Sequence, residues 1–353
     1  MKKIVLGSLV VATLLMTGCS QSDEKKNETN VVKSAKVEKS SADGIIVTPE
    51  NFQRAEAIRN ANNYVKLGAD NKWIPFRNPA PIGPNAPTIR MNLDTLYSVA
   101  VVDNSNGKFN ITIPESDELY TVLVFDDEAY SLYYFQTPGK HEIVSDSPFI
   151  IMIARQGMRD YKNPKDIEKA HKMQDGLKMS GNGTKPFNPT KYDQESLKAL
   201  TQKLNKEFLA GDGVLVYGQF KDDVDEHKRL LSNASGWGGM HDQINTYTSS
   251  AMLSGKECRQ VSFIDPKVRD FFSFTMYDKD GYLMDGKITI NSYNMKKNSD
   301  GTYTVHFNCG KEVLNNISSS GRNYNYTVRT YGASDIVKSG EWNPVKTTVE
   351  VKK

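Results

Sequence analysis

The stretch NAPTIRMNLDTLYSVAVVD, residues 85–103, determines how the rest of the chain is interpreted. It begins in a Pro-rich loop, becomes polar around Asn92 and Asp94, and continues as a strand from Tyr97. Strand interiors favour β-branched and aromatic residues and are poor in Asn and Asp. The two polar residues therefore indicate either a turn, in which Asn and Asp side chains bond their own backbone, or a functional site at the mouth of a strand.

Short strand patterns recur on both sides of a helical middle. Alternating apolar residues predict strands at 97–102, 109–113, 119–125, 130–136 and 149–154, and again at 260–264, 272–277, 287–292, 302–307, 324–331 and 346–351. Helical spacing predicts helices that begin at Thr48-Pro49, with Thr48 as N-cap, at Asn163-Pro164, along 197–208 and over 222–234. We therefore expect a mainly β protein with α, made of two antiparallel β-sandwich-like domains joined by a helical segment.

The chain divides into five predicted segments. Their bounds are 1–19 for a signal peptide, 20–47 for a disordered tether, 48–160 for an N-terminal β domain, 161–256 for a helical connection and 257–353 for a C-terminal β domain. The tether is polar, charged and free of aromatic residues, so it cannot bury enough apolar surface to offset the entropy of ordering it.

The N-terminus carries a targeting pattern. Lys2 and Lys3 precede an apolar run that is too short to span a bilayer permanently, and the run ends in Met-Thr-Gly followed by Cys19. This order resembles the lipobox of bacterial lipoproteins, in which the Cys is acylated. Ser20 after the Cys resembles the outer-membrane sorting rule. We expect a lipid-anchored envelope protein at the outer membrane, facing the periplasm. An ordinary cleaved signal with an incidental Cys is the alternative.

Only two other cysteines occur, Cys258 and Cys309. Both lie near predicted strand ends in the C-terminal β domain, and an envelope location permits disulfides. We predict a bond between them, with two separate thiols as the alternative; Cα atoms more than about 7 Å apart would exclude the bond.

The familiar catalytic and ligand-binding motifs do not occur. The chain has no Gly-rich phosphate loop, no His-Glu-x-x-His pair, no Cys-x-x-Cys pair and no Gly-x-Ser-x-Gly elbow. Its five histidines are scattered, so no metal site is predicted, and the sequence does not indicate which cofactor, if any, the chain uses. A net charge of +3 with evenly spread Lys and Arg argues against a nucleic-acid partner.

Several short motifs together resemble a pair of bacterial families. In chain order they are Asn92-x-Asp94-Thr95-x-Tyr97-Ser98, Phe272-Ser273-Phe274-Thr275-Met276-Tyr277, Asp280-Gly281-Tyr282, Asn298-x-Asp300-Gly301-Thr302, Arg329-x-Tyr331 and Gly340-x-Trp342. The chain is similar in these motifs to the families catalogued as domain of unknown function 1254 and domain of unknown function 1214. The resemblance implies two β-sandwich-like domains and no settled activity.

Asn92, Asp94 and Tyr97 are candidate ligand-binding residues, completed by Arg329 or Tyr331. An inward-directed Arg329 would need a carboxylate, because an unpaired buried charge is very costly, and Asp94 is one candidate. Three functions remain open: an envelope protein that binds a small molecule in a cleft between two β domains, a hydrolase or metal-assisted enzyme that uses the same cleft, and a purely structural envelope protein.

Overall fold

The computed structural model describes residues 40–41, 43–220, 223–241 and 244–351. Residues 39–353 belong to one compact unit, which is mainly β with α. The predicted signal peptide, most of the tether and Cys19 lie outside the described residues. Gly44–Ile45 pairs with Ser40–Ser41 as strands β2 and β1, and Val47 is buried, so packed chain begins ahead of the predicted boundary at residue 48. No helix within the described ranges has the length and apolar character needed to cross a membrane.

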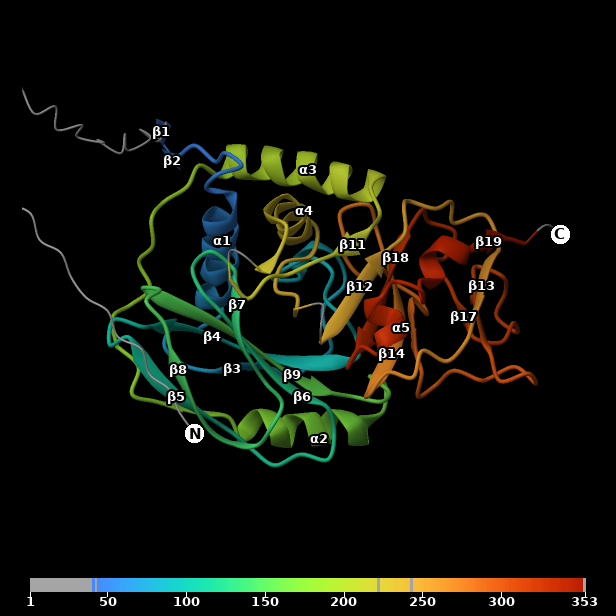
Figure 1. The fold of residues 1–353 in the computed structure, drawn as a ribbon, viewed down its shortest axis with the longest axis horizontal. Coiled ribbons are helices and arrows are strands. Elements are labelled where there is room, and N and C mark those ends of the chain that lie inside the picture. Colours follow the sequence, from blue (N-terminus) through green and yellow to red (C-terminus); the bar gives the residue numbers. More distant parts are fainter. Residues whose placement is uncertain (1–39, 42, 221–222, 242–243, 352–353) are drawn as a thin grey trace, which may run out of the picture. The chain divides into compact units, whose positions relative to one another are not determined.

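The N-terminal half is built on two antiparallel sheets (Figure 1). The larger has the strand order β3 (Ile74–Phe76), β4 (Thr95–Asp103), β9 (Phe149–Gly157), β6 (Tyr120–Phe125) and β7 (Ser131–Phe135). The smaller has the order β10 (Lys178–Ser180), β5 (Lys108–Ile113) and β8 (Gly139–Val144). The sequence analysis did not predict β8, whose polar and largely exposed pattern lacks an apolar run.

Two helices cover opposite faces of the larger sheet (Figure 1). Helix α1 (Phe52–Lys66) shares a core with Val99 and Val101 of β4. Helix α2 (Pro164–Asp175) shares a different core with Leu96 and Ala100 of the same strand. Because successive side chains of a strand point to opposite faces, β4 is buried on both sides.

The segment predicted as a helical connection also contributes strands. Helices α3 (Gln194–Ala210) and α4 (Glu226–Gly236) pack against each other, and each begins at an Asp whose side chain accepts a backbone N–H. Strands β11 (Val214–Leu215) and β12 (Asn245–Ser249) leave this segment and extend a sheet of the C-terminal half. Helix α4 begins four residues later than the predicted start at 222.

The C-terminal half contains two further sheets. One has the order β11, β12, β18 (Asn325–Tyr331), β14 (Phe271–Tyr277) and β15 (Thr289–Asn291). The other has the order β17 (Asn316–Ile317), β16 (Tyr303–Phe307), β13 (Arg259–Phe263) and β19 (Val349–Glu350). Among the described strands of these two sheets, every pairing is antiparallel except that of β16 with β17. Aromatic stacking of Phe263 on Phe274 and of Phe307 on Tyr326 joins the two sheets.

One predicted strand of this half is much shorter than expected. Residues Pro344–Thr347 form a 3-10 turn, and only Val349–Glu350 is strand, so the prediction for 346–351 was too long. Pro344 at the start of the turn provides no N–H for a sheet. A short helix α5 (Asp335–Lys338) precedes it.

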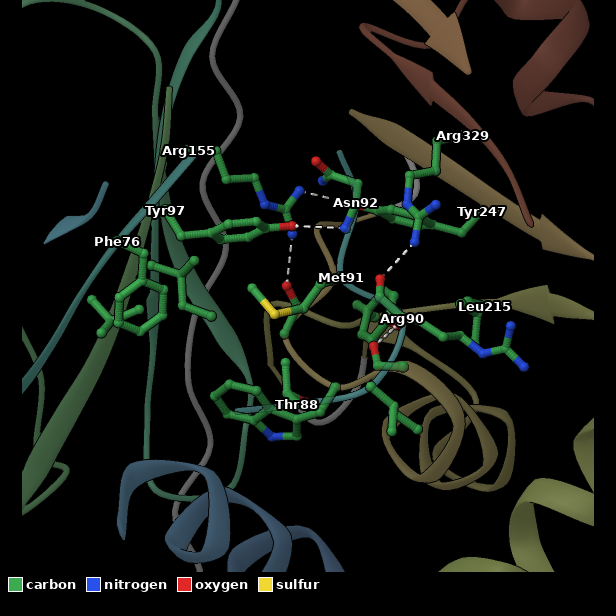
Figure 2. Close-up of a pocket in the computed structure, with 18 of the residues that line it drawn as sticks. Phe76, Thr88, Arg90, Met91, Asn92, Tyr97, Arg155, Leu215, Tyr247 and Arg329 are labelled. Carbon is green, nitrogen blue, oxygen red and sulfur yellow. Dashed lines mark hydrogen bonds between the residues drawn. The ribbon is translucent and has the colours of Figure 1, made fainter. Parts of the chain in front are cut away.

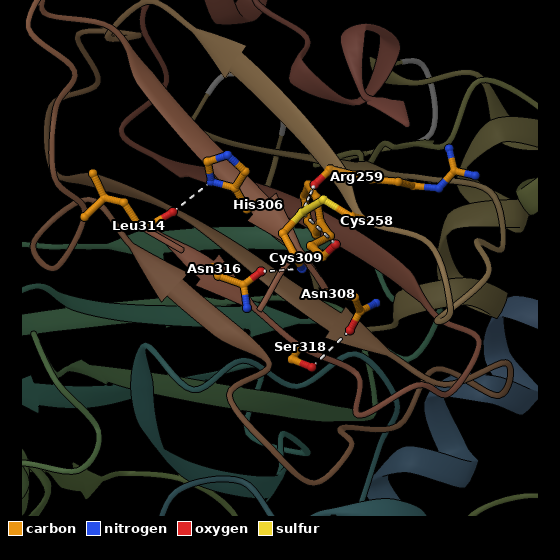
Figure 3. The surroundings of a disulfide bond; sticks show 9 residues. Cys258, Arg259, His306, Asn308, Cys309, Leu314, Asn316 and Ser318 are labelled. Atoms are coloured by element: carbon orange, nitrogen blue, oxygen red, sulfur yellow. Dashed lines mark hydrogen bonds between the residues drawn. A yellow bond between two sulfur atoms is a disulfide. The ribbon is translucent and has the colours of Figure 1, made fainter. Parts of the chain in front are cut away.

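Cys258 and Cys309 form a disulfide (Figure 3). Cys258 directly precedes β13 and Cys309 follows β16, its partner strand, whose register pairs Arg259 with Phe307. The antiparallel pairing therefore brings the two cysteines together, with Cα atoms 4.5 Å apart, well inside the limit of about 7 Å. The bond closes a loop across the two central strands of this sheet.

Candidate functional site

The stretch from Arg90 to Asp94 lies on the seam between the two halves. The Arg90 main chain has φ +53°, a left-handed conformation that costs energy for a residue with a side chain. Its N–H donates to the carbonyl of Gly281 at 2.8 Å. One residue later, the carbonyl of Met91 accepts from the Tyr277 hydroxyl at 2.9 Å. The loop before β4 is therefore held in a strained shape by the C-terminal half.

Asn92 forms the turn that its sequence position suggested. Its Oδ1 accepts from the backbone N–H groups of Asp94 and Thr95, both at 3.0 Å, and its own N–H donates to the Tyr97 hydroxyl at 3.1 Å. β4 starts only at Thr95, so Asp94 precedes the strand. The rule that successive side chains of a strand point to opposite faces therefore does not apply to Asp94. The bend required for Asp94 and Tyr97 to approach the same region is thus provided by Asn92.

Each half contributes an arginine and a tyrosine from neighbouring strands. In the N-terminal half, Tyr97 of β4 pairs in register with Arg155 of β9. In the C-terminal half, Tyr247 of β12 pairs with Arg329 of β18. Residues directly opposite in an antiparallel pair share a face of the sheet. Both arginines are therefore directed to the inner face by strand register, and both are buried.

These residues line a cavity between the two halves (Figure 2). The space inside it that is open to the centre of a water molecule is about 40 Å³. Figure 2 shows the guanidinium groups of Arg155 and Arg329 on either side of Asn92. The lining is completed by aromatic and apolar side chains and a glycine-rich loop: Tyr64, Phe76, Thr88, Ile89, Met91, Tyr97, Val99, Ile153, Leu215, Tyr217, Gly236, Trp237, Gly238, Gly239 and Tyr247, with Arg90.

The three arginines of the cavity are bonded mainly to neutral acceptors. Arg90 donates to the Ser235 carbonyl at 2.5 Å and to Asn325 Oδ1 at 2.7 Å. Arg155 donates from Nη2 to the Gly238 carbonyl at 2.9 Å, and Arg329 from Nη2 to the Arg90 carbonyl at 2.7 Å.

None of the described residues that line the cavity is acidic. Burial lowers the pKa of Arg90 to about 10, and the positive charge of Arg329 adds to the decrease. The lining therefore holds positive charge without a carboxylate of its own.

Several buried donors in this lining have no acceptor. Among the described atoms, Arg155 Nε, Arg329 Nη1 and Trp237 Nε1 are buried without a hydrogen-bond partner. Buried polar groups are almost always paired, so each such group calls for an explanation. All three are N–H donors on the lining of one cavity, where an acceptor with negative charge would satisfy them.

Asp94 lies beside the cavity and does not line it. It accepts from Ser273 Oγ at 2.6 Å, from the Tyr331 hydroxyl at 3.2 Å and from Asn291 Nδ2 at 3.5 Å. Burial raises the pKa of Asp94, although these hydrogen bonds and the charge of Arg329 oppose the increase. No direct hydrogen bond joins Asp94 to Arg329 among the described residues, although the two opposite charges attract each other.

Tyr247 has an unusual hydroxyl group. Its oxygen accepts from the Met240 N–H at 3.2 Å and from Arg155 Nη1 at 3.3 Å. Burial disfavours the phenolate, but the charge and hydrogen bond of Arg155 outweigh it and hold the pKa of Tyr247 below its usual value. Both bonds leave the hydroxyl proton of Tyr247 free to be donated.

Of the five predicted ligand-binding residues, the cavity brings together Asn92, Tyr97 and Arg329. Asp94 and Tyr331 bond each other next to it. Sequence reasoning missed Arg90, Arg155 and Tyr247. Arg155 could have been found in the sequence, because it directly follows the apolar run of residues 149–154 in the same strand. Burying a charged residue is costly, so an arginine at such a position indicates a functional or paired group.

The Gly236-Trp237-Gly238-Gly239 run both packs into the core and borders the cavity. Trp237 is packed, with its ring 5.3 Å from that of Phe125, and its loop also lines the cavity. Elsewhere within the described ranges, no group of three or more His, Cys, Asp or Glu is placed to hold a metal ion.

The fold and the site define a β-rich protein in which two β domains, with α3 and α4 between them, meet at an arginine-lined cavity. Its fold is similar to that of the VPA0106 protein from Vibrio parahaemolyticus, with a TM-score of 0.59 and 17% identity over 86% of this chain and 100% of the other. An uncharacterized protein from Burkholderia cenocepacia matches over 81% of this chain and 86% of its own, with 16% identity and a TM-score of 0.49. No family model and no curated protein sequence matches the chain.

Proposed function

We propose that this chain is an envelope lipoprotein that binds a small anionic molecule in the cavity between its two β domains. The observation that carries the proposal is the set of buried arginine donors, Arg155 Nε and Arg329 Nη1, that have no acceptor among the described residues. An arginine in a protein is effectively always charged, and an uncompensated buried charge is very costly. A bound anion would remove this cost.

The envelope location is supported separately from the cavity. The Met-Thr-Gly-Cys19 pattern suits a lipid anchor, and the Cys258–Cys309 disulfide suits an oxidising compartment. Short motifs of the chain resemble the families of domain of unknown function 1254 and 1214, and we propose a distant relationship to that pair, although no family model matches the chain. In this proposal the lipid tethers the protein to the outer membrane, and the cavity samples small solutes in the periplasm.

Thermal unfolding of the full chain in detergent tests the binding function. Tryptophan fluorescence is a suitable signal because Trp237 lines the cavity. Carboxylate, sulfate and phosphate salts are compared at constant ionic strength. An anion at 100 times its dissociation constant would stabilise the folded chain by about 2.7 kcal/mol, and the unfolding temperature should go on rising with the logarithm of the anion concentration above the dissociation constant.

Two substitutions separate binding in the cavity from a general salt effect. Arg155→Met should abolish the rise in unfolding temperature that the anion causes. Arg322→Met is the matched control, because Arg322 also donates to backbone carbonyls, those of Ser319 and Asp285, but lies outside the cavity. A shift of equal size in the wild type and in both variants, or no shift with any anion, would refute the proposed function.

Acid–base catalysis is a second candidate function, favoured by Tyr247. Its hydroxyl accepts two hydrogen bonds and keeps its own proton for donation, next to a positively charged arginine. Such a group can protonate or deprotonate a bound substrate. This function requires that Tyr247 ionises at a lower pH than the other tyrosines. Absorbance at 295 nm, which follows tyrosinate formation, is measured during a pH titration of the wild type and of Tyr247→Phe. The part of the absorbance rise at the lowest pH should be missing in the variant.

A further inference from the structure

We propose that the ligand of this cavity is a small monocarboxylate with a short apolar tail. The inference rests on the proposed function of anion binding and adds the chemical class of the anion. It is carried by three features of the cavity: the number of its unpaired donors, the apolar character of the rest of its lining, and its size.

The unpaired donors match the head group of a carboxylate. Arg155 Nε offers one N–H without a partner, Arg329 Nη1 offers two, and Trp237 Nε1 offers a further one. Figure 2 shows the two guanidinium groups on either side of Asn92, so they approach the space from two directions. A carboxylate has two oxygens and one negative charge, and each oxygen can accept from a different arginine.

One part of the wall suits hydrocarbon, although the lining also carries hydroxyl groups, among them those of Thr88 and Tyr247. Val99 and Ile153 are buried side chains of the central strands β4 and β9, and Phe76 and Met91 border the same space. A tetrahedral anion such as phosphate or sulfate would place further oxygens against these side chains without donors. Unpaired polar atoms in an apolar environment are disfavoured, so this wall selects a ligand whose opposite end is apolar.

The volume limits the length of the tail. One water molecule needs roughly 10–15 Å³ of the space open to its centre, so a cavity of about 40 Å³ has room for a few atoms beyond a single water. Acetate and propionate have this size. Larger acids such as benzoate would require the lining side chains to move.

Calorimetric titration of the full chain in detergent tests the inference. Acetate, propionate, phosphate, sulfate and the neutral acetamide are each titrated at constant ionic strength and pH 7. We expect acetate or propionate to bind at least tenfold more tightly than phosphate or sulfate, and acetamide to show no binding. Arg155→Met should weaken carboxylate binding at least tenfold, whereas Arg322→Met should leave it unchanged.

A conservative variant tests the position of the tail. Ile153→Val removes one methylene from the apolar wall, so the preference for butyrate over propionate should rise by about fourfold, the worth of one buried methylene. An unchanged preference would place the tail elsewhere and overturn this part of the inference.

The failure of the inference and the failure of the proposed function give different results. If phosphate or sulfate binds as tightly as the carboxylates and Arg155→Met abolishes that binding, the inference is wrong while anion binding stands. If no anion binds, or if Arg155→Met leaves all binding unchanged, both are wrong.

Discussion

Arg329 donates a hydrogen bond from Nη2 to the main-chain carbonyl of Arg90 at 2.7 Å, although the two residues are 239 positions apart in the sequence. The contact holds two buried arginines close together and depends on the left-handed conformation of Arg90, at φ +53°. Strained backbone and adjacent like charges are both unfavourable. Their coincidence at one cavity is the strongest structural reason to treat this region as a site.

Replacement of Arg329 by Met should not destabilise the ligand-free protein. The substitution removes a buried charge that has an unpaired donor, and apolar replacement of buried charges is often neutral or stabilising by about 1–4 kcal/mol. Urea unfolding at low salt measures the free energy of unfolding. Arg322→Met controls for the loss of an arginine bonded to carbonyls. A loss of about 3–5 kcal/mol in Arg329→Met would instead indicate a broken structural ion pair.

Asp94 should make stability decrease as the pH rises. Because burial raises the pKa of Asp94 in the folded protein, the folded state binds the proton more tightly than the unfolded state, whose pKa is about 3.9. Below pH 4 Asp94 is protonated in both states and costs no stability. Between pH 4 and the raised pKa of Asp94, the free energy of unfolding should fall as the pH rises.

The Asp94→Asn variant should lack this slope. The free energy of unfolding, measured by urea titration at several values from pH 4 to pH 8, should fall more steeply with pH in the wild type than in the variant. If the free energy of unfolding depends on pH equally in the wild type and in Asp94→Asn, ionisation of Asp94 costs the folded state nothing and the prediction is wrong.

Gly239→Ala should damage the cavity through Tyr217. An added Cβ would lie 2.0 Å from a carbon of the Tyr217 ring, and a ring packed in the interior cannot bend away. Overpacking of this kind costs about 1–3 kcal/mol, and anion binding should weaken with it. Gly211→Ala is the matched control, since its Cβ would meet nothing closer than 3.4 Å. Calorimetric unfolding and anion titration of both variants check the prediction, which fails if the two behave alike.

Loss of the Cys258–Cys309 disulfide should lower stability without changing the cavity. The bond joins residues 51 positions apart, and closing a loop of that length stabilises by roughly 4 kcal/mol in the chain-entropy model and often by less in practice. The Cys258→Ser/Cys309→Ser double variant should unfold at lower urea and bind anions with unchanged affinity. Titration of thiols in the denatured, unreduced protein should find neither cysteine reactive; two reactive thiols there would contradict the bond.

Cys19 should carry the lipid of the mature protein. The charged start, apolar run and Met-Thr-Gly-Cys order predict acylation at this residue. Metabolic labelling with a palmitate analogue should mark the wild type in the membrane fraction and should not mark Cys19→Ser. A variant that still takes up the label and stays with the membrane would show that the anchor is elsewhere.

The sequence by itself determined most of the secondary structure of this protein. Period-two apolar patterns located strands such as β4 and β9, because a strand buried between layers must carry apolar residues along its length. Asn92 and the residues around it were also recognisable as a turn, since an Asx side chain bonds backbone within three residues of itself. These are local interactions, and local interactions leave a local pattern.

Only the tertiary structure decided which polar residues form the site. Asn92, Tyr97 and Arg329 were chosen from the sequence and do line the cavity, but Asp94 is turned toward Ser273 and Tyr331. Arg90, Arg155 and Tyr247 enter because the register of two separate sheets and the fold of one loop bring them together. Strand register between segments far apart in the chain has no sequence period of its own. For that physical reason a cavity assembled across two β domains is visible in the fold and not in the sequence.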